Sequence, residues 1–401
     1  MEVGKYLNRY IFIFSLLLFK ADAEPTHPIK EFTTVRPGVH LHSWLYLTAH
    51  PEGFNKRPLI LWLSGGPGQS SIAIGNFLQI GPYDGDLNQR DTSWAKYCSV
   101  LFVDSPVGTG FSYADGEHLF TSDVFGVVTD LLEYLRQFFS VKHPEFKGLE
   151  FYIVGSSYSG KVAPRLALQL HQEIRNGRID SNFKGIAIGG PWISPISSTS
   201  SWGNFWHSMS IINSIDKVKV DRLARRFAAL LETGRGGNMT AYKVHSEMMM
   251  LLYKAGIDAN LYNVMENIHG TLFMRNATAS SRIVNRRMKD DVMTEHSSYE
   301  KVSEILQTTN LTVICYNGQF DGIVPAIGTE AVLDSLKWYG GEEFRNAKAF
   351  YFKTPGCNSN AGFVKKYAGL SYYVVYGAGH YVFAEKGIVG IKILKDMVND
   401  S

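Results

Sequence analysis

The sequence predicts an α/β fold in which a mostly parallel central sheet is covered by helices and interrupted by a helical cap insertion. In the first half of the 401-residue chain, short apolar runs alternate with amphipathic segments, which is the pattern of parallel strands joined by helices. From about residue 199 to residue 299, Met- and Arg-rich amphipathic stretches with few strand signals replace this alternation. The strand pattern then resumes, so one α/β domain with an insertion accounts for the whole chain.

Each expected element follows from its local pattern. Residues 42–48 are typical of an early antiparallel strand, and the continuous apolar runs Leu59–Leu63 and Ser99–Val103 are typical of strands buried on both faces. A Thr-Ser-Asp cluster at 121–123 can cap a helix that reaches about Phe139. The later elements are strands at 151–154, 185–188, 311–316, 348–353 and 371–375, and helices at about 161–174 and 387–398.

Composition and charge exclude several classes of protein. The chain is 45% apolar and 19% charged, which indicates a globular protein rather than a disordered or fibrous one. The formal net charge is only +3, and Lys and Arg are scattered, so we expect no nucleic-acid partner. Short basic clusters at 222–226 and 286–289 are interpreted as solvated helix faces. No residue spacing indicates a metal or cofactor site, and we expect neither.

The N-terminal residues predict entry into the secretory pathway. Two basic residues precede the apolar run 11–19, and Ala-Asp-Ala follows at 21–23 as a cleavage signal. Because nine residues are too few to span a bilayer, we expect a signal peptide over 1–23 and a mature domain over 24–401, secreted or lysosomal and without a membrane span. An uncleaved anchor is the alternative. The internal N-x-S/T sequons that fit this route are Asn238, Asn276 and Asn310.

The chain contains three cysteines, so at least one thiol is free or bonded to another chain. Cys315 lies in an apolar strand-like run and is expected to be a buried free thiol. The sequence leaves open whether Cys98 and Cys357 form a bridge.

The candidate nucleophile is Ser157. The apolar run 151–154 leads into Gly-Ser-Ser-Tyr-Ser-Gly at 155–160, close to the G-x-S-x-G pattern, and a helical pattern follows. Small residues around the central serine allow a strained strand-to-helix turn that exposes its hydroxyl. The alternative is a Gly/Ser turn without chemistry, which the flanking strand and helix disfavour. The chain is therefore expected to have an α/β-hydrolase fold.

A serine hydroxyl becomes a good nucleophile only when an imidazole removes its proton and a carboxylate orients the imidazole. In this fold the three groups follow in the order serine, acid, histidine. Asp321 comes shortly after the strand-like run 311–316, and His380 follows the run 371–375 in a loop of small residues. A lone Asp or His there would more often be a turn cap or a packed polar residue. The presence of both, in the required order, favours a catalytic pair.

A glycine-rich turn at 64–68 follows the strand Leu59–Leu63. Because glycine has no Cβ, the backbone N–H groups of this turn can approach a substrate and stabilise an oxyanion. A plain tight turn is the alternative. A phosphate-binding loop is disfavoured because the Lys that such a loop requires is missing.

Four segments in order resemble the serine carboxypeptidase family, and the resemblance extends over nearly the whole mature chain. They are residues 62–71, 103–113, 157–160 and 377–380. The retinoid-inducible branch of the family is the most similar, on the basis of residues 75–77, 80–82, 192–195 and 316–319.

The resemblance implies a serine-type carboxypeptidase that acts on peptide or protein C-termini without a cofactor. It implies that Ser157 is acylated, that His380 is the general base and then the general acid, and that Asp321 orients His380. By the same resemblance, the backbone N–H groups of Gly66 and Tyr158 form the oxyanion hole. The loop that contains Asp104 is expected to be structural.

The sequence departs from the family where the C-terminal carboxylate of the substrate is bound. Family members use an Asn and a Gly before the oxyanion glycine, a Glu on the next helix and a Glu just before the nucleophile. The corresponding residues here are Ser64, Gly65, Gln79 and Ser156, of which only the glycine matches. We therefore expect altered recognition of the substrate terminus.

Two alternatives to a carboxypeptidase stay open. An esterase or acyltransferase would use the same acyl-enzyme with a different substrate. A secreted binding protein would keep the fold after catalysis had decayed, which an intact Ser-Asp-His set disfavours.

Overall fold

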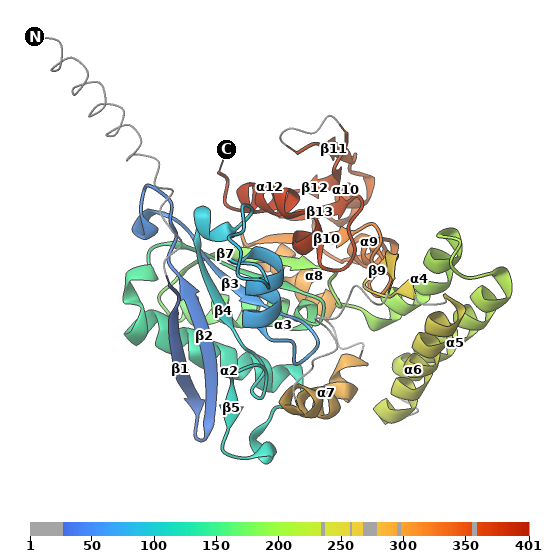
Figure 1. The fold of residues 1–401 in the computed structure, drawn as a ribbon, viewed down its shortest axis with the longest axis horizontal. Coiled ribbons are helices and arrows are strands. Elements are labelled where there is room, and N and C mark those ends of the chain that lie inside the picture. Colours follow the sequence, from blue (N-terminus) through green and yellow to red (C-terminus); the bar gives the residue numbers. More distant parts are fainter. Residues whose placement is uncertain are drawn as a thin grey trace, which may run out of the picture.

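The computed structural model describes residues 27–233, 237–256, 259–267, 279–294, 298–354 and 359–400. The predicted signal peptide at 1–23, its boundary at Glu24, the Asn276 sequon and Cys357 lie outside these residues. The part that is described is built around one large twisted sheet with helices on both faces (Figure 1).

The strands of the sheet lie in the order β1-β2-β4-β3-β6-β7-β10-β13-β12-β11, and β5 pairs with β2. From β4 to β13 neighbouring strands are parallel, whereas β1, β2, β12 and β11 add antiparallel pairs at the two edges. The predicted, mostly parallel sheet is thus confirmed. The strands are β1 (Ile29–Arg36), β2 (Val39–Tyr46), β3 (Leu59–Leu63), β4 (Ser99–Val103), β5 (Tyr113–Ala114), β6 (Glu150–Ser156), β7 (Asn182–Gly189), β10 (Thr312–Gly318), β11 (Phe350–Phe352), β12 (Gly362–Tyr367) and β13 (Leu370–Val375).

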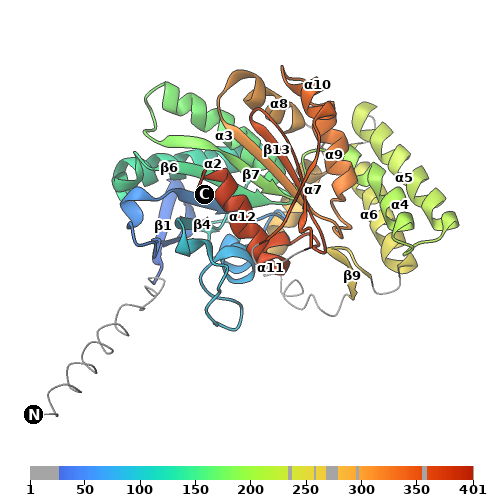
Figure 2. The same cartoon turned by 90° about the horizontal axis from the view of Figure 1, so that it is seen from above.

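Alternate residues of each central strand face opposite helical layers, as the pleat of a strand requires. In β3, Leu59, Leu61 and Leu63 join one apolar cluster, and Ile60 and Trp62 join the other. Figure 2 shows α2, α3 and α8 on one face of the sheet and α11 and α12 on the other. These helices are α2 (Val124–Gln137), α3 (Ser159–Arg175), α8 (Ser298–Thr308), α11 (Val382–Glu385) and α12 (Gly387–Met397), and the remaining core segments are η2 (Ser71–Ile80), α9 (Ala326–Ser335), α10 (Gly341–Asn346) and the short turns η1 (Phe54–Lys56), η3 (Trp94–Lys96), η4 (Glu117–Leu119), η5 (Phe138–Lys142) and η6 (Pro144–Phe146).

Between β7 and α8 the chain forms a mainly helical unit beside the sheet (Figure 1). Its elements are α4 (Pro195–Ser208), α5 (Ser214–Thr233), α6 (Gly237–Ala255), the hairpin of β8 (Ala259–Asn260) and β9 (Asn263–Asn267), and α7 (Ala279–Val292). Its helices α4 to α6 build a third apolar cluster, which includes Trp202, Trp206 and Phe227 and continues into Trp192 and Val324 of the sheet domain. Its first helix begins before the predicted boundary at 199, because Ser194 caps it and Pro195 fits its first position.

The sequence missed several elements that depend on tertiary contacts. β1 and β12 lie near the sheet edges, and their apolar alternation is weak because β1 buries Thr33 and leaves Phe32 half exposed, while β12 buries Lys365. The β8–β9 hairpin is too short to give a strand signal. The helix predicted to reach Phe139 ends as α2 at Gln137 and continues as the wider turn η5.

The described thiols are buried and free. Cys315 is the buried free thiol that the sequence predicted, and Cys98 is also free, with its Sγ donating to Trp94 O. Of the sequons, Asn238 lies in the first turn of α6, and Asn310 is exposed between α8 and β10. In the described ranges we find no helix long and apolar enough to cross a membrane.

Candidate active site

Ser157 occupies the turn between β6 and α3. Its φ is 58°, in the left-handed region that non-glycine residues seldom adopt, which is the strained turn that the sequence predicted. The Ser157 N–H donates to Gly189 O at 2.8 Å, and the Trp192 N–H donates to Ser157 O at 3.0 Å. These two bonds fix the peptide groups on both sides of the serine Cα.

His380 and Asp321 form a buried pair. His380 Nδ1 lies 2.6 Å from Asp321 Oδ2, and both side chains are almost fully inaccessible to solvent. The N–H groups of Ile323 and Val324 donate to Asp321 Oδ1 at 3.0 and 2.8 Å. Within the described part of the chain, Nε2 of His380 is buried without a hydrogen-bond partner. This nitrogen is therefore available to take a proton from a hydroxyl.

The end of β7 contacts both the serine turn and the histidine pair. Gly189 O accepts the Ser157 N–H, and Gly190, with φ 47°, packs against the other two side chains. A Cβ at Gly190 would lie 2.7 Å from His380 Nδ1 and 2.9 Å from Asp321 Oδ2. All three predicted catalytic residues thus lie at the carboxyl end of neighbouring parallel strands, where this class of fold builds its sites.

The glycine-rich turn lies against the nucleophile turn. A Cβ at Gly65 would lie 2.5 Å from Ser157 Cβ and 3.0 Å from the Tyr158 nitrogen, so only glycine fits here. Gly66 has φ 108°, which also requires glycine. The two predicted oxyanion donors, Gly66 and Tyr158, therefore belong to segments that are packed together.

The residues predicted to bind the substrate terminus are buried. Ser64 donates its N–H to Ser71 Oγ at 3.0 Å and accepts the Trp62 Nε1–H at 3.1 Å. Gln79 and Ser156 are each 2% exposed, and among the described residues Gln79 Nε2 and Ser156 Oγ have no partner. Buried polar atoms without partners are costly, which makes these two groups candidates for contact with a ligand.

Asp104 links the glycine-rich turn to the loop that follows β4. Its Oδ1 accepts the Ser70 hydroxyl at 2.6 Å and the Ile72 N–H at 3.2 Å, and its Oδ2 accepts the Phe111 N–H at 3.0 Å. Burial raises the pKa of Asp104 to about 6, although these hydrogen bonds oppose the shift. The contacts agree with the structural role expected from the sequence.

Sequence reasoning missed the part of the cap that supports the histidine loop. The His380 N–H donates to Tyr262 O at 2.6 Å. The carboxylate of Glu385 accepts both the Gly379 N–H and the Asn263 amide, at 2.8 and 2.7 Å, and burial raises its pKa. No local pattern could identify these contacts, because their partners come from the β8–β9 hairpin and from the C-terminal part of the chain.

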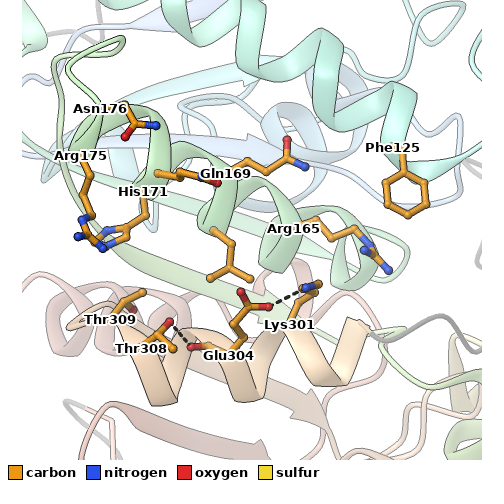
Figure 3. Close-up of a pocket in the computed structure, with 12 residues that line it drawn as sticks. Phe125, Arg165, Gln169, His171, Arg175, Asn176, Lys301, Glu304, Thr308 and Thr309 are labelled. Atoms are coloured by element: carbon orange, nitrogen blue, oxygen red, sulfur yellow. Dashed lines mark hydrogen bonds and ion pairs between the residues drawn. The ribbon is translucent and has the colours of Figure 1, made fainter.

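A cavity of about 700 Å³ lies away from these residues, between α3 and α8 (Figure 3). Figure 3 shows Arg165, His171 and Arg175 on one wall and the Lys301–Glu304 ion pair on the other. None of the predicted site residues lines this cavity, so it is separate from the candidate catalytic residues.

Comparison with known proteins gives consistent matches. A family model described as serine carboxypeptidase matches residues 30–301 and 259–400. Retinoid-inducible serine carboxypeptidase of Homo sapiens is 33% identical, and the match covers 92% of this chain and 92% of that protein. The Rattus norvegicus protein of the same name is 32% identical, with 91% and 90% covered.

Solved structures match the fold. A prohormone-processing carboxypeptidase from Saccharomyces cerevisiae superposes with a TM-score of 0.79 at 21% identity, covering 96% of this chain and 94% of that chain. A proline iminopeptidase from Mycobacterium smegmatis gives a TM-score of 0.51 at 11% identity, covering 92% and 98%. At these identities the likeness concerns the fold alone, and it confirms the predicted fold class.

Proposed function

Because this chain belongs to the serine carboxypeptidase family, we propose that it removes C-terminal residues from peptides and proteins through an acyl-enzyme on Ser157. The observation that carries this proposal is the buried 2.6 Å pair of His380 and Asp321. The Nε2 of His380, which has no partner among the described residues, lies on the same edge of the sheet as the strained serine turn. A serine, an imidazole and a carboxylate are the groups that acyl transfer requires.

In the proposed acylation step, Ser157 Oγ attacks the carbonyl carbon of the last peptide bond and His380 Nε2 takes the hydroxyl proton. Asp321 holds the Nδ1–H tautomer and stabilises the imidazolium. The imidazolium then gives its proton to the leaving amine as the C–N bond breaks. A water molecule, deprotonated by the same nitrogen, then attacks the ester, and His380 returns this proton to Ser157 Oγ as the acyl C–O bond breaks.

The negative charge on the attacked oxygen is the second requirement of this reaction. We assign its stabilisation to the backbone N–H groups of Gly66 and Tyr158. The close packing of Gly65 against Ser157 and Tyr158 supports this assignment, because it holds the two donor segments at fixed separation. Donors that are already oriented need no reorganisation in the transition state.

Recognition of the substrate terminus is proposed to differ from that of relatives that carry two glutamates. Gln79 Nε2 and the Ser156 hydroxyl, which have no partner in the described part of the chain, are neutral donors at every working pH, and neither can ionise. Binding of a free carboxylate therefore loses the acid dependence that titrating glutamates impose. A neutral subsite also accepts a substrate group that carries no charge. The residues Gln79 and Ser156 therefore favour a second candidate function, that of an esterase or acyltransferase.

We also propose that the protein travels the secretory pathway as a glycoprotein, secreted or lysosomal. The motivation is the N-terminal pattern of the sequence, and the exposure of Asn310 supports it. A sequon can be modified only where the asparagine is accessible.

Labelling of the purified protein with a fluorophosphonate tests the proposed nucleophile. We expect labelling of the native protein, none in Ser157→Ala and a strong reduction in His380→Ala, because the hydroxyl is then no longer activated. Labelling that survives Ser157→Ala would refute the assignment. Turnover of one acyl-dipeptide as free acid, amide and ester then separates the carboxypeptidase from the esterase, which would act on the ester alone.

A further inference from the structure

We propose that Asp291, at the end of the cap helix α7, and the side chain of Tyr158 form a positioning pair that holds the Tyr158 N–H in the oxyanion hole. This inference rests on the proposed function, since it concerns the same site. In this arrangement α7, the last helix of the insertion, helps to hold the catalytic residues in place.

The pair is buried and fully hydrogen-bonded. Tyr158 OH donates to Asp291 Oδ2 at 2.6 Å, and the Val124 N–H donates to Asp291 Oδ1 at 3.1 Å. Tyr158 is 2% exposed and Asp291 is 7% exposed. One carboxylate thus joins the first residue of α2 to the residue that follows the nucleophile, and Figure 1 shows α7 close to α2 at the lower edge of the molecule.

The residues that follow Asp291 are hydrogen-bonded to side chains near the nucleophile turn. Lys161 Nζ, in the first turn of α3, donates to Thr294 O at 2.6 Å, and Trp192 Nε1 donates to Val292 O at 3.0 Å. The N–H of Trp192 in turn donates to Ser157 O. These bonds fix the end of α7 relative to the nucleophile turn.

The first half of α7 lies against the other oxyanion segment. A Cβ at Gly68, which has φ 94°, would lie 3.1 Å from Ser281 O and 3.4 Å from Val284 Cβ. The glycine-rich turn therefore packs against the first half of α7 through Gly68. Tyr158 is hydrogen-bonded to Asp291 at the opposite end of the same helix. One helix thus contacts both of the segments that contain the proposed donors.

The strained serine turn needs such support. A non-glycine residue in the left-handed region costs on the order of 1–3 kcal/mol and persists only where its surroundings hold it. Burial and the negative charge of Asp291 raise the pKa of Tyr158 well above its usual value, so the phenol keeps its proton and remains a donor. Its hydrogen bond to a carboxylate is of the strong, charge-assisted kind.

The decisive variant is Tyr158→Phe, which removes one hydroxyl and keeps the ring. Because the oxyanion exists only in the transition state, displacement of its donor lowers kcat and leaves KM unchanged. We expect a fall in kcat on the order of 10-fold, less than the roughly 10²- to 10³-fold loss that follows complete removal of a donor. Binding of a peptide aldehyde, whose adduct on Ser157 carries the same negative oxygen, should weaken by a similar factor.

Asp291→Ala tests the partner, and the double variant tests the coupling. If the two side chains act as one unit, Tyr158→Phe with Asp291→Ala is no slower than Asp291→Ala alone. Asp291→Asn, which keeps the shape of the side chain, replaces Asp291→Ala if loss of the Val124 contact prevents folding. The matched control is Tyr373→Phe, because Tyr373 OH also donates to a carboxylate, Asp396 Oδ2, at 2.6 Å.

Amide hydrogen exchange of residues 157–160 in the full chain provides a readout that does not require activity. Faster exchange in both single variants, with unchanged exchange in Tyr373→Phe, is the expected result. Unchanged kcat in Tyr158→Phe, additive losses in the double variant, or an equal loss of kcat in Tyr373→Phe would each overturn the inference. The two proposals can fail separately. If a fluorophosphonate does not label Ser157 in the native protein, the proposed function is wrong. Unchanged amide exchange at residues 157–160 in the variants would refute the positioning pair whatever the labelling result.

Discussion

Asp321 divides its two carboxylate oxygens between different partners: Oδ2 lies 2.6 Å from His380 Nδ1, and Oδ1 accepts two backbone N–H groups. The backbone donors fix the rotation of the carboxylate about its Cβ–Cγ bond. The oxygen that faces the imidazole can therefore act only as an acceptor, which selects the tautomer with a proton on Nδ1 and a free Nε2.

Asp321→Asn should consequently abolish most activity without unfolding the protein. The two backbone N–H groups will hold the amide oxygen, so the NH₂ group must face His380 and force Nδ1 to accept. Nε2 then carries the proton and cannot take one from Ser157. We expect kcat to fall by about 10⁴-fold, measured on a peptide substrate, with the thermal midpoint as the control. A variant that keeps more than a tenth of native kcat would contradict this geometry.

Gly65→Ala should disrupt the site through close contact alone. The new Cβ would lie 2.5 Å from Ser157 Cβ and 2.8 Å from Ser156 O, and these atoms cannot move aside as a flexible side chain would. We expect strong loss of fluorophosphonate labelling. Gly148→Ala is the matched control, because a Cβ there meets nothing within 4 Å. Similar labelling of both variants would exclude the tight packing of the two turns.

The neutral residues Gln79 and Ser156 should make the protein tolerant of blocked C-termini. Because the Ser156 hydroxyl and the Gln79 amide are expected to make one or two fewer hydrogen bonds to the substrate carboxylate than a glutamate pair, at about 1.5–3 kcal/mol each, discrimination for a free acid should fall by on the order of one to three powers of ten. The measurement is kcat/KM for one peptide as acid and as amide from pH 4 to 8. The double variant Gln79→Glu, Ser156→Glu should restore preference for the acid at low pH. A strong native preference that the double variant leaves unchanged would assign the carboxylate to another residue.

His245 should destabilise the protein at acidic pH. Its ring contacts Trp202 and Phe227, its Nε2 is buried without a partner among the described residues, and burial lowers its pKa to about 4. The unfolded chain, with the usual value of 6.5, binds a proton more readily. Stability from this residue is therefore present above pH 6.5 and is lost as the pH falls toward 4.

A folded-state pKa of about 4 against the usual 6.5 corresponds to about 3 kcal/mol of stability between the two protonation states. Denaturant unfolding at pH 7.5 and 4.5 measures it, and His245→Phe should lose less stability between the two values than the native protein does. Equal losses in both proteins would show that His245 is not the group responsible.

Expression in animal cells should yield a glycosylated protein that begins near Glu24. Asn310→Gln should lower the mass by one glycan, because the exposed Asn310 lies between α8 and β10 and is open to modification. Mass spectrometry before and after N-glycan removal is the measurement. A product that retains Met1 and carries no glycan would rule out the secretory route.

The central strands and the chain order of the candidate catalytic residues could be predicted from the sequence. β3 and β4 have the predicted bounds because strands buried on both faces leave continuous apolar runs, and the turn at Ser157 follows from small residues between a strand and a helix. These features depend on neighbouring residues, so a local pattern suffices to identify them. The altered terminus recognition assigned to Gln79 and Ser156 rests on the family resemblance and stays a prediction.

The distant groups that support the site could be identified only from the folded chain. Tyr158 and Asp291 are 133 residues apart, and His380 bonds to the backbone of Tyr262 in the cap. Such contacts arise when β7, the cap helices and the C-terminal loops meet at one edge of the sheet, and no periodicity in the chain encodes their distances. The physical reason is that a strand or a helix is specified by its own side chains, whereas the geometry of a buried polar site is specified by the packing of several elements at once.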